Sequence, residues 1–339
     1  IASLSLMFSV NAGELTVNGT AKATYNAHSG VQGDNGIGVT NELNFTASGE
    51  MDNGYTWSYS MELDPSTGSA AGGETAGAAV NDDTAISLTM NDMGTIKVCV
   101  SECGNNKKYA WDASAYTKMS DTGYSEGIVY PSDAGAYASI QYHTPELPYG
   151  TTASIAYGQG KKDGQSGNTL GVDKSNSIEE YSLVTKPIDG LTISASYYDV
   201  KDYDDGIVTE EQLEEGGALA AKYAYGNFTV GYGKSMVAPE TTTATRASGA
   251  STAEYYTNVG MSLGYAVNDD LSISYTREES EPTYQTSATV SNDIEMDSIQ
   301  IAYSMGGATL SVARAEHENA GYVKDIDVTE TIIAVAFAF

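Results

Sequence analysis

The stretch TETIIAVAFAF, residues 329–339, contains the pattern that determines the fold. Ile333, Val335, Phe337 and Phe339 stand on one parity, and alanine fills most of the positions between them. Since successive side chains of a β-strand point to opposite faces, this period of two predicts an amphipathic strand. The chain therefore ends in a strand with one apolar face and a terminal aromatic residue.

The same period of two recurs from the beginning of the chain. In residues 14–26, ELTVNGTAKATYN, Leu15 and Val17 stand on an apolar parity, whereas threonine, asparagine and lysine fill the other. Residues 41–51 and 55–64 repeat this alternation. It predicts strands that separate an apolar environment from water.

The connections between these segments alternate between short turns and long polar loops. Seven short and eight long connections join sixteen strands. This layout is typical of bacterial outer-membrane barrels, and closure removes the exposed edges of a sheet. The sequence therefore predicts an all-β fold, a 16-stranded antiparallel transmembrane β-barrel. The short connections lie at 52–54, 91–94, 145–150, 187–190, 226–227, 268–270 and 306–307, and the long ones near 27–40, 65–83, 101–135, 159–176, 199–215, 235–253, 278–293 and 317–327.

Composition excludes several classes of protein. The 339 residues include 45 Asp and Glu but only 16 Lys and Arg, which gives a formal net charge of −29. A general nucleic-acid binder needs a basic face, so no nucleic-acid partner is expected. The mature region contains no run of about eighteen apolar residues, which a membrane-spanning helix requires.

The first residues differ from the rest of the chain. Residues 1–12, IASLSLMFSVNA, are similar to the end of a signal peptide, with Val10 and Ala12 at the small-residue positions of a cleavage site. We therefore expect a residual signal peptide at 1–12 and a mature barrel at 13–339. A genuine N-terminal strand or plug is the alternative.

One long connection differs from the others in composition. In residues 101–133 the alternation stops, and Tyr109, Trp111 and Tyr116 occur among polar residues. A structureless loop of this length is uncommon in a compact domain, and these aromatic side chains need a surface on which to pack. We predict that a loop at about 101–135 folds into the lumen and narrows it.

Two hairpin segments resemble those of a known family. In SIQYHTPELPYGTTASIAYG (139–158), Tyr142, Thr144, Pro145 and Gly150 match the strand–turn–strand stretch of Gram-negative general diffusion porins, especially the alphaproteobacterial type. Residues 186–199 resemble another hairpin of that group, and the terminal Phe resembles the signal that the outer-membrane assembly machinery recognises. The inward loop lacks the Pro-Glu-Phe-Gly-Gly tip of the enterobacterial members.

This resemblance implies a location, a function and partners. It implies a homotrimer in the bacterial outer membrane, reached by export through the periplasm. The trimer would pass small hydrophilic solutes and ions by passive diffusion through a water-filled channel, without a cofactor and without enzymatic activity. In the family the second loop, here 65–83, latches neighbouring subunits, and outward Ala21 and Ala23 would allow close approach.

Charged residues on the polar parity and on the inward loop are candidates for the pore lining. A ring of like charge selects the opposite ion. Acids outnumber bases on the loop, so we expect a weak cation preference. The loop candidates are Glu102, Asp112, Asp121, Glu126 and Asp133, and the wall candidates are Lys22, Lys97, Lys222, Glu42 and Glu62.

Three basic residues occur on the apolar parity, namely Lys234, Arg277 and Arg314. A charge facing lipid at mid-bilayer costs about 2–4 kcal/mol but little at the interface. We therefore expect these residues at the outer rim, in contact with lipopolysaccharide phosphates. A local bulge that turns them inward is the alternative.

The remaining candidates concern cysteines, metals and other functions. Cys99 and Cys103 are a candidate disulfide in an exported protein. The three histidines lie in or beside separate connections, so neither a catalytic nor a metal site is predicted, although calcium could bind acidic loops. A substrate-selective channel for a cationic nutrient and a secreted adhesive β protein with acidic calcium-binding loops are the alternative functions.

Overall fold

The computed structural model describes most of the chain. The described residues are 15–30, 35–65, 79–100, 103–119, 127–161, 177–201, 210–242, 253–285 and 291–339. The predicted signal peptide at 1–12 lies outside them. No helix among the described residues is long and apolar enough to cross a membrane.

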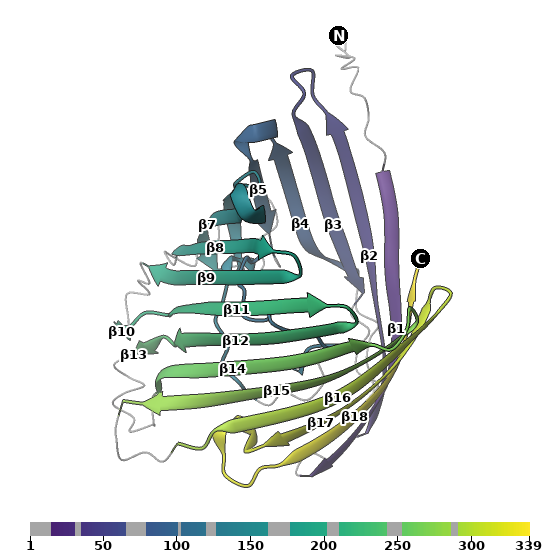
Figure 1. Ribbon diagram of the computed structural model, residues 1–339. Coiled ribbons are helices and arrows are strands. Elements are labelled where there is room, and N and C mark those ends of the chain that lie inside the picture. The colour runs from purple at the N-terminus through teal and green to yellow at the C-terminus, as the bar shows by residue number, and fades with distance from the viewer. Residues whose placement is uncertain are drawn as a thin grey trace.

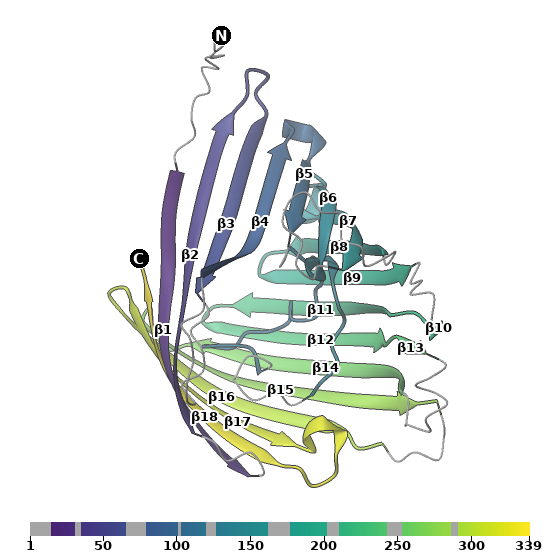
Figure 2. The ribbon, with the colours of Figure 1, turned by 180° about the vertical axis from the view of Figure 1, so that it is seen from behind.

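Within these residues, sixteen antiparallel strands form one closed barrel, which confirms the predicted fold (Figures 1 and 2). Strands β10 (Glu210–Gln212) and β13 (Thr241–Thr242) pair separately at the rim of long loops. The barrel strands are β1 (Leu15–Gly30), β2 (Gly36–Glu50), β3 (Thr56–Pro65), β4 (Ala79–Thr89), β5 (Thr95–Val100), β6 (Tyr137–His143), β7 (Thr152–Lys161), β8 (Ser177–Ile188), β9 (Leu191–Lys201), β11 (Glu215–Tyr225), β12 (Phe228–Ala238), β14 (Ala253–Ala266), β15 (Leu271–Tyr284), β16 (Ile294–Met305), β17 (Ala308–Glu318) and β18 (Val328–Ala338). Short 3-10 helices are η1 (Asn91–Met93), η3 (Ala134–Ala136), η4 (Pro148–Gly150) and η5 (Ala320–Tyr322).

The first and the last barrel strand close the barrel. Strand β1 pairs with β18 from Thr20 opposite Ala338 to Gly30 opposite Val328. The terminal Phe339 adds two backbone hydrogen bonds, because Gly19 N–H donates to Phe339 O and Phe339 N–H donates to Gly19 O. The final strand thus satisfies backbone groups that an open sheet would leave unpaired.

Short turns and long connections lie at opposite rims, as predicted. The tight turn between β8 and β9 requires glycine, since Gly190 has a φ of 76° and an added Cβ would collide with Ala224 O. The predicted loop at 27–40 is mostly strand, because β1 runs to Gly30 and β2 begins at Gly36. Pairing with β18 and with each other supports these extensions.

The two faces of the wall have different side chains. Outward positions are apolar and exposed, as for Ile299, which is 62% exposed, and Phe337. Inward positions carry small or polar residues such as Ser274 and Gln300, which are buried. Ile333 and Val335 lie on the outward parity, as the sequence pattern predicted. Burial of the inward residues shows that something inside the barrel covers them.

Candidate functional site

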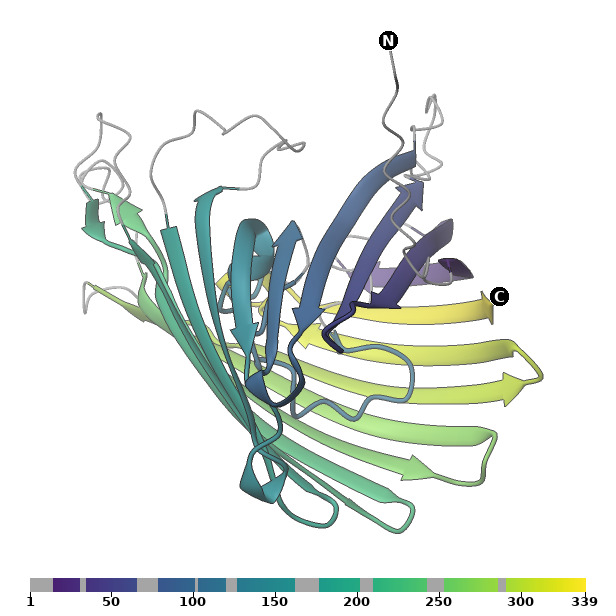
Figure 3. The ribbon, with the colours of Figure 1, turned by 90° about the horizontal axis from the view of Figure 1, so that it is seen from above.

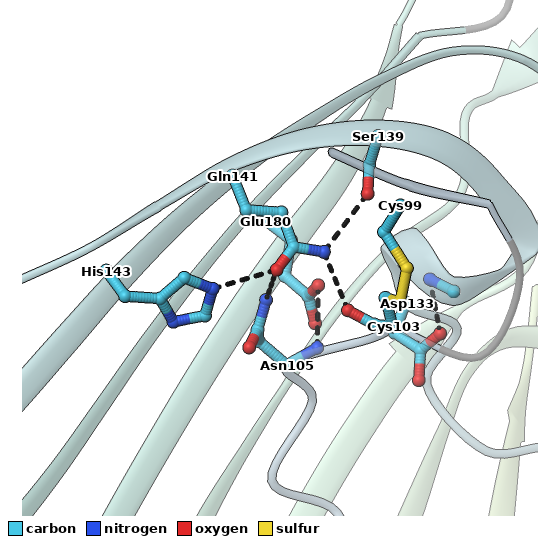
Figure 4. Close-up of a disulfide and its surroundings, with 9 residues drawn as sticks. Cys99, Cys103, Asn105, Asp133, Ser139, Gln141, His143 and Glu180 are labelled. Carbon is cyan, nitrogen blue, oxygen red and sulfur yellow. Dashed lines mark hydrogen bonds between the residues drawn. A yellow bond between two sulfur atoms is a disulfide. The ribbon is translucent and has the colours of Figure 1, made fainter. Parts of the chain in front are cut away.

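A disulfide marks the point where the chain leaves the wall. Cys99, near the end of β5, is bonded to Cys103, with their Cα atoms 6.2 Å apart (Figure 4). Gln141 of β6 donates a 2.7 Å hydrogen bond to Cys103 O and accepts one of 3.1 Å from the Asn105 side chain. The chain is therefore directed inward immediately after β5.

A buried glutamate of β8 holds both legs of the inward segment. Glu180 is 1% exposed, and its Oε2 accepts hydrogen bonds from Asn105 N–H at 3.0 Å and from Ala134 N–H at 3.2 Å. Asn105 lies on the outgoing leg and Ala134 on the returning leg, and Figure 4 shows Glu180 beside Asn105. One carboxylate thus fixes both ends of the segment at the same place on the wall.

The outgoing leg then follows the inner wall toward β16 (Figure 3). At successive strands of the wall, the leg is held by a hydrogen bond to a polar side chain that points inward. Lys107 N–H donates to Ser196 Oγ of β9, Lys222 Nζ of β11 donates to Asp112 O, and Ser262 Oγ of β14 donates to Trp111 O. Further along, Ala115 N–H donates to Ser274 Oγ of β15, and Tyr116 N–H and Thr117 N–H both donate to Gln300 Oε1 of β16.

Trp111 is seated in a groove of glycines. The side chain is 3% exposed, and its Nε1 donates a 2.7 Å hydrogen bond to Lys108 O. A Cβ at Gly233 of β12, or at Gly260 opposite it on β14, would collide with the indole ring. The absence of side chains at these two positions therefore leaves the space that the Trp111 ring occupies.

The returning leg packs against the same wall. Asn258 of β14 donates to Val129 O at 3.0 Å, and Val129 N–H donates to the Tyr322 hydroxyl at 3.3 Å. Met119 packs with Ile294 and Met296, two inward residues of β16. The inward apolar residues at this end of β16 are therefore covered by the loop rather than by lipid.

The contacts of the loop gather on the wall from β6 to β16, so the open part of the lumen lies toward β1–β5. That wall carries the predicted Lys22, Glu42, Glu62 and Lys97. The ammonium of Lys22 lies 5.9 Å from the centre of the Tyr116 ring, which brings β1 close to the loop. Loop and wall together place charges of both signs inside the barrel.

The predicted loop acids have different positions. Glu102, Asp121 and Glu126 lie outside the described residues. Asp112 Oδ1 accepts hydrogen bonds from Ser114 N–H at 3.1 Å and Ser114 Oγ at 2.7 Å, and Asp133 accepts one from Gly135 N–H at 2.9 Å. Both described acids therefore also stabilise turns of the loop.

The sequence analysis did not predict that lysines and tyrosines of the loop contact one another. The Lys118 ammonium lies 4.6 Å from the centre of the Tyr109 ring, and Lys108 lies 5.6 Å from the same ring. Lys108 also donates a 2.8 Å hydrogen bond to Pro131 O of the returning leg. The run of basic residues followed by aromatic residues in NNKKYAW was the signal in the sequence, and it did not indicate which residues contact one another.

The three predicted rim cations lie on the outward faces of β12, β15 and β17. Arg277 pairs with Asp297 at 2.9 Å and with Glu295, and Arg314 pairs with Glu316 at 3.1 Å. In the part of the chain that the structure describes, Lys234 has no such ion pair. The two arginines therefore have protein carboxylates as partners already, which the sequence did not indicate.

The histidines do not form a catalytic or metal arrangement. His28 of β1 lies 2.8 Å from Glu330 Oε1 of β18, on the inward face. Across the described ranges, no three His, Cys, Asp or Glu side chains are arranged to hold a metal ion. The acidic loops proposed for calcium fall largely outside those ranges.

A closed sixteen-stranded barrel with a covered inner wall and a narrowed polar lumen is an outer-membrane diffusion channel. The family model for Gram-negative porins matches residues 2–321, and the chain belongs to that family. It is therefore a protein of the bacterial outer membrane that forms a water-filled channel. No curated protein sequence matches the chain significantly.

Solved porin structures share the fold. OmpF of Salmonella typhi, in complex with daunomycin, is 17% identical with a TM-score of 0.72, and the match covers 96% of this chain and 98% of that one. An anion-selective porin from Comamonas acidovorans is 14% identical, with a TM-score of 0.68 and coverage of 96% and 100%. OmpT of Vibrio cholerae is 10% identical, with a TM-score of 0.69 and coverage of 98% and 100%.

Raising the pH from neutral toward the ordinary lysine pKa of about 10.4 should make the channel more cation-preferring. Burial lowers the pKa of both Lys107 and Lys108, so these loop lysines lose their positive charge before exposed lysines do. The reversal potential across a salt gradient, measured as a function of pH, reports this change. Lys108→Gln should weaken the dependence of the reversal potential on pH. Lys324→Gln should not, because Lys324 is exposed and lies beyond the lumen. Identical profiles for the two variants would contradict this assignment.

Proposed function

We propose that the channel passes small hydrophilic solutes and ions with a weak cation preference. The observation that carries this proposal is the loop pinned to one wall, which leaves a passage lined by both signs of charge. Lys107, Lys108 and Lys118 offset the acids of the same loop, so the excess of negative charge at the loop is smaller than the net charge of −29 implies. Charges on distant loops are screened beyond about 8 Å at physiological salt.

The reversal potential of the purified protein in a planar bilayer tests the preference. We expect a small cation preference that decreases as salt rises, since acidic outer loops enrich cations at the mouth only at low ionic strength. The double variant Asp112→Asn with Glu42→Gln should shift permeability toward anions. The matched variant Glu281→Gln with Glu318→Gln removes two outward acids and should change little. Equal reversal potentials for both variants and the parent would refute the placement of the constriction.

We further propose that the protein is a homotrimer. The outward face of β1 and β2 is apolar and exposed. It includes Val17 and Ile37, and Val39 lies opposite the small Ala23. Ala23→Trp should dissociate the trimer, because a bulky side chain blocks close approach of a neighbouring subunit. Ala221→Trp, on the outward face of β11 across the barrel, should not. Mass measurement in mild detergent distinguishes the two variants, and a monomeric parent would refute the proposal.

Lipopolysaccharide is the proposed neighbour of the wall around β15–β17. Arg277 and Arg314 face outward there, and each guanidinium has five N–H donors, more than its carboxylate partners use. Phosphates can therefore bind beside the existing ion pairs. We expect no catalytic activity and no cofactor for transport through this channel.

A further inference from the structure

The connection between β17 and β18, residues 319–327 and here called the outer connection, is ordered by its own hydrogen bonds. Asn319 N–H donates to the Asp327 carboxylate at 3.2 Å, and the Asn319 side chain donates to Asp293 O at 3.0 Å. Tyr322 has a φ of 60°, a backbone conformation that residues other than glycine rarely adopt. A strained residue in an ordered segment indicates a functional constraint on its side chain.

The Tyr322 side chain reaches from the outer connection to the inward loop. Its hydroxyl accepts a 3.3 Å hydrogen bond from Val129 N–H and lies 2.7 Å from Ser280 Oγ. Because Ser280 Oγ donates its own hydrogen to Asn258 Oδ1 at 2.6 Å, the Tyr322 hydroxyl is the donor to Ser280. Burial raises the pKa of Tyr322 to about 12, so this hydroxyl keeps the proton that it donates.

Three side chains, Asn258, Ser280 and Tyr322, therefore enclose Val129, and we call them the Val129 clamp. Asn258 Nδ2 donates to Val129 O at 3.0 Å, so the clamp satisfies both backbone polar groups of Val129. Asn258 and Ser280 are 3% and 0% exposed, and hydrogen bonds of a buried network strengthen one another. Two members of the clamp belong to the wall, on β14 and β15, whereas Tyr322 belongs to the outer connection.

Two further contacts join the outer connection to the inward loop. Gly127 and Gly321 approach each other closely, since a Cβ added to Gly127 would lie 3.2 Å from Gly321 Cα. The aromatic ring of Tyr322 packs, together with Ile128, against the buried cluster that includes Met119. Met119 lies on the outgoing leg and Ile128 on the returning leg, so the outer connection packs beside both legs.

The position of Val129 affects a charged group of the loop. Pro131, two residues further along the returning leg, accepts a 2.8 Å hydrogen bond from the Lys108 ammonium. Lys108 contributes to the charge balance of the proposed passage. A shift of the returning leg at Val129 would therefore change both the outline of the passage and the position of a charge beside it.

We propose that Tyr322 is a positioning residue of the channel, which holds the returning leg of the inward loop at Val129 from the outer connection and thereby sets the width of the passage. This role rests on the proposed passage between the loop and the wall. Asn258 holds Val129 O, but Val129 N–H depends on the hydroxyl of Tyr322. Without that hydroxyl the leg alternates between a held and a released position, and the current alternates between two levels.

Single-channel recording in a planar bilayer tests this role. Tyr322→Phe removes the hydroxyl and retains the aromatic ring. The fraction of time spent at a second current level should rise about fivefold, the factor that corresponds to the net free energy of one hydrogen bond. Tyr322→Ala also removes the packing of the aromatic ring and should raise that fraction further. Parental currents in both folded variants would overturn the proposal.

The Val129 clamp also predicts that its members do not act independently. Ser280→Ala interrupts the same clamp from the wall, so Tyr322→Phe combined with Ser280→Ala should behave like either single variant. Independent effects of the two substitutions would contradict the clamp. Tyr225→Phe changes an exposed tyrosine of β11, and Lys324→Gln changes an exposed side chain of the outer connection, so both should leave the current unchanged.

Two further measurements make the outcome specific. The heat-dependent shift in electrophoretic mobility verifies that each variant is folded, and a residue with only a structural role would change that shift and not the current. Trp111→Ala, recorded in the same way, distinguishes two failures. A current altered by Trp111→Ala but not by the Tyr322 variants would overturn the role of Tyr322 alone. Unaltered currents in all of these variants would overturn the placement of the constriction as well.

Discussion

Trp111→Ala should raise the single-channel conductance and make the open-channel current noisier. Trp111 fills a seat made by Gly233 and Gly260 and is almost completely buried. Truncating a buried tryptophan costs about 3–5 kcal/mol, more than the few hydrogen bonds of this part of the loop can replace. The loop should therefore leave the wall at this point, so that the constriction becomes wider and variable. Planar-bilayer recording of single channels measures both effects.

Two further variants make this test specific. Gly260→Ala places a methyl group where the indole ring lies and should produce the same change. Gly36→Ala places its methyl group where no other atom lies within 4 Å, so it should leave the conductance unchanged. Trp57→Ala removes the other tryptophan, on β3 outside the loop, and should leave conductance unchanged. Normal conductance in Trp111→Ala would show that the hydrogen bonds to Ser274 and Gln300 hold the loop without its anchor.

Glu180→Ala should release both legs of the inward loop and destabilise the constriction. The substitution leaves Asn105 N–H and Ala134 N–H without their acceptor in a buried site, at a cost of about 1–3 kcal/mol for each group. The Cys99–Cys103 disulfide still holds the base of the outgoing leg, so the barrel itself should remain folded. We expect frequent closures and a broadened distribution of conductance.

The neighbouring glutamate provides the control. Glu179 lies on the outward face of the same strand, where it pairs with Lys201 at 2.9 Å, and Glu179→Ala should leave the current unchanged. Glu180→Gln retains a carbonyl acceptor and should fall between the parent and the alanine variant. Equal current traces for Glu180→Ala and Glu179→Ala would contradict the role assigned to Glu180.

The sequence by itself determined the class of fold. Alternation with a period of two is a local property, so it can be read in 329–339 or in 41–51 without knowledge of any partner strand. The lengths of the connections are also a local property. They predicted the number of strands, and they predicted that short turns lie at one rim of the barrel and long loops at the other. Strand ends were less predictable. Polar residues at 27–40 suit a loop as well as the upper wall of a barrel. Residues 27–30 are extended because they pair with β18, and residues 36–40 because they pair with β1.

The parity of charged side chains was also a local property. Lys22 and Lys222 face the lumen, and Lys234, Arg277 and Arg314 face outward, as the alternation indicated. Their partners were not local. Arg277 meets Asp297 because β15 and β16 are in register at that level, and one residue of slip would send either side chain to the other face.

Only the tertiary structure decided how the loop is held. Gly233 and Gly260 are separated by a long connection, and their meeting beneath Trp111 depends on the register of β12 with β14. Glu180 of β8 joins Asn105 to Ala134 because the loop leaves the wall after β5, returns to it at β6, and both legs pass beside β8. Gly217 lies between Tyr197 and Met236 for the same reason, since three strands must align to place a glycine between two large side chains. Local periodicity specifies which face a residue occupies, whereas cross-strand register and loop closure specify which residue it meets.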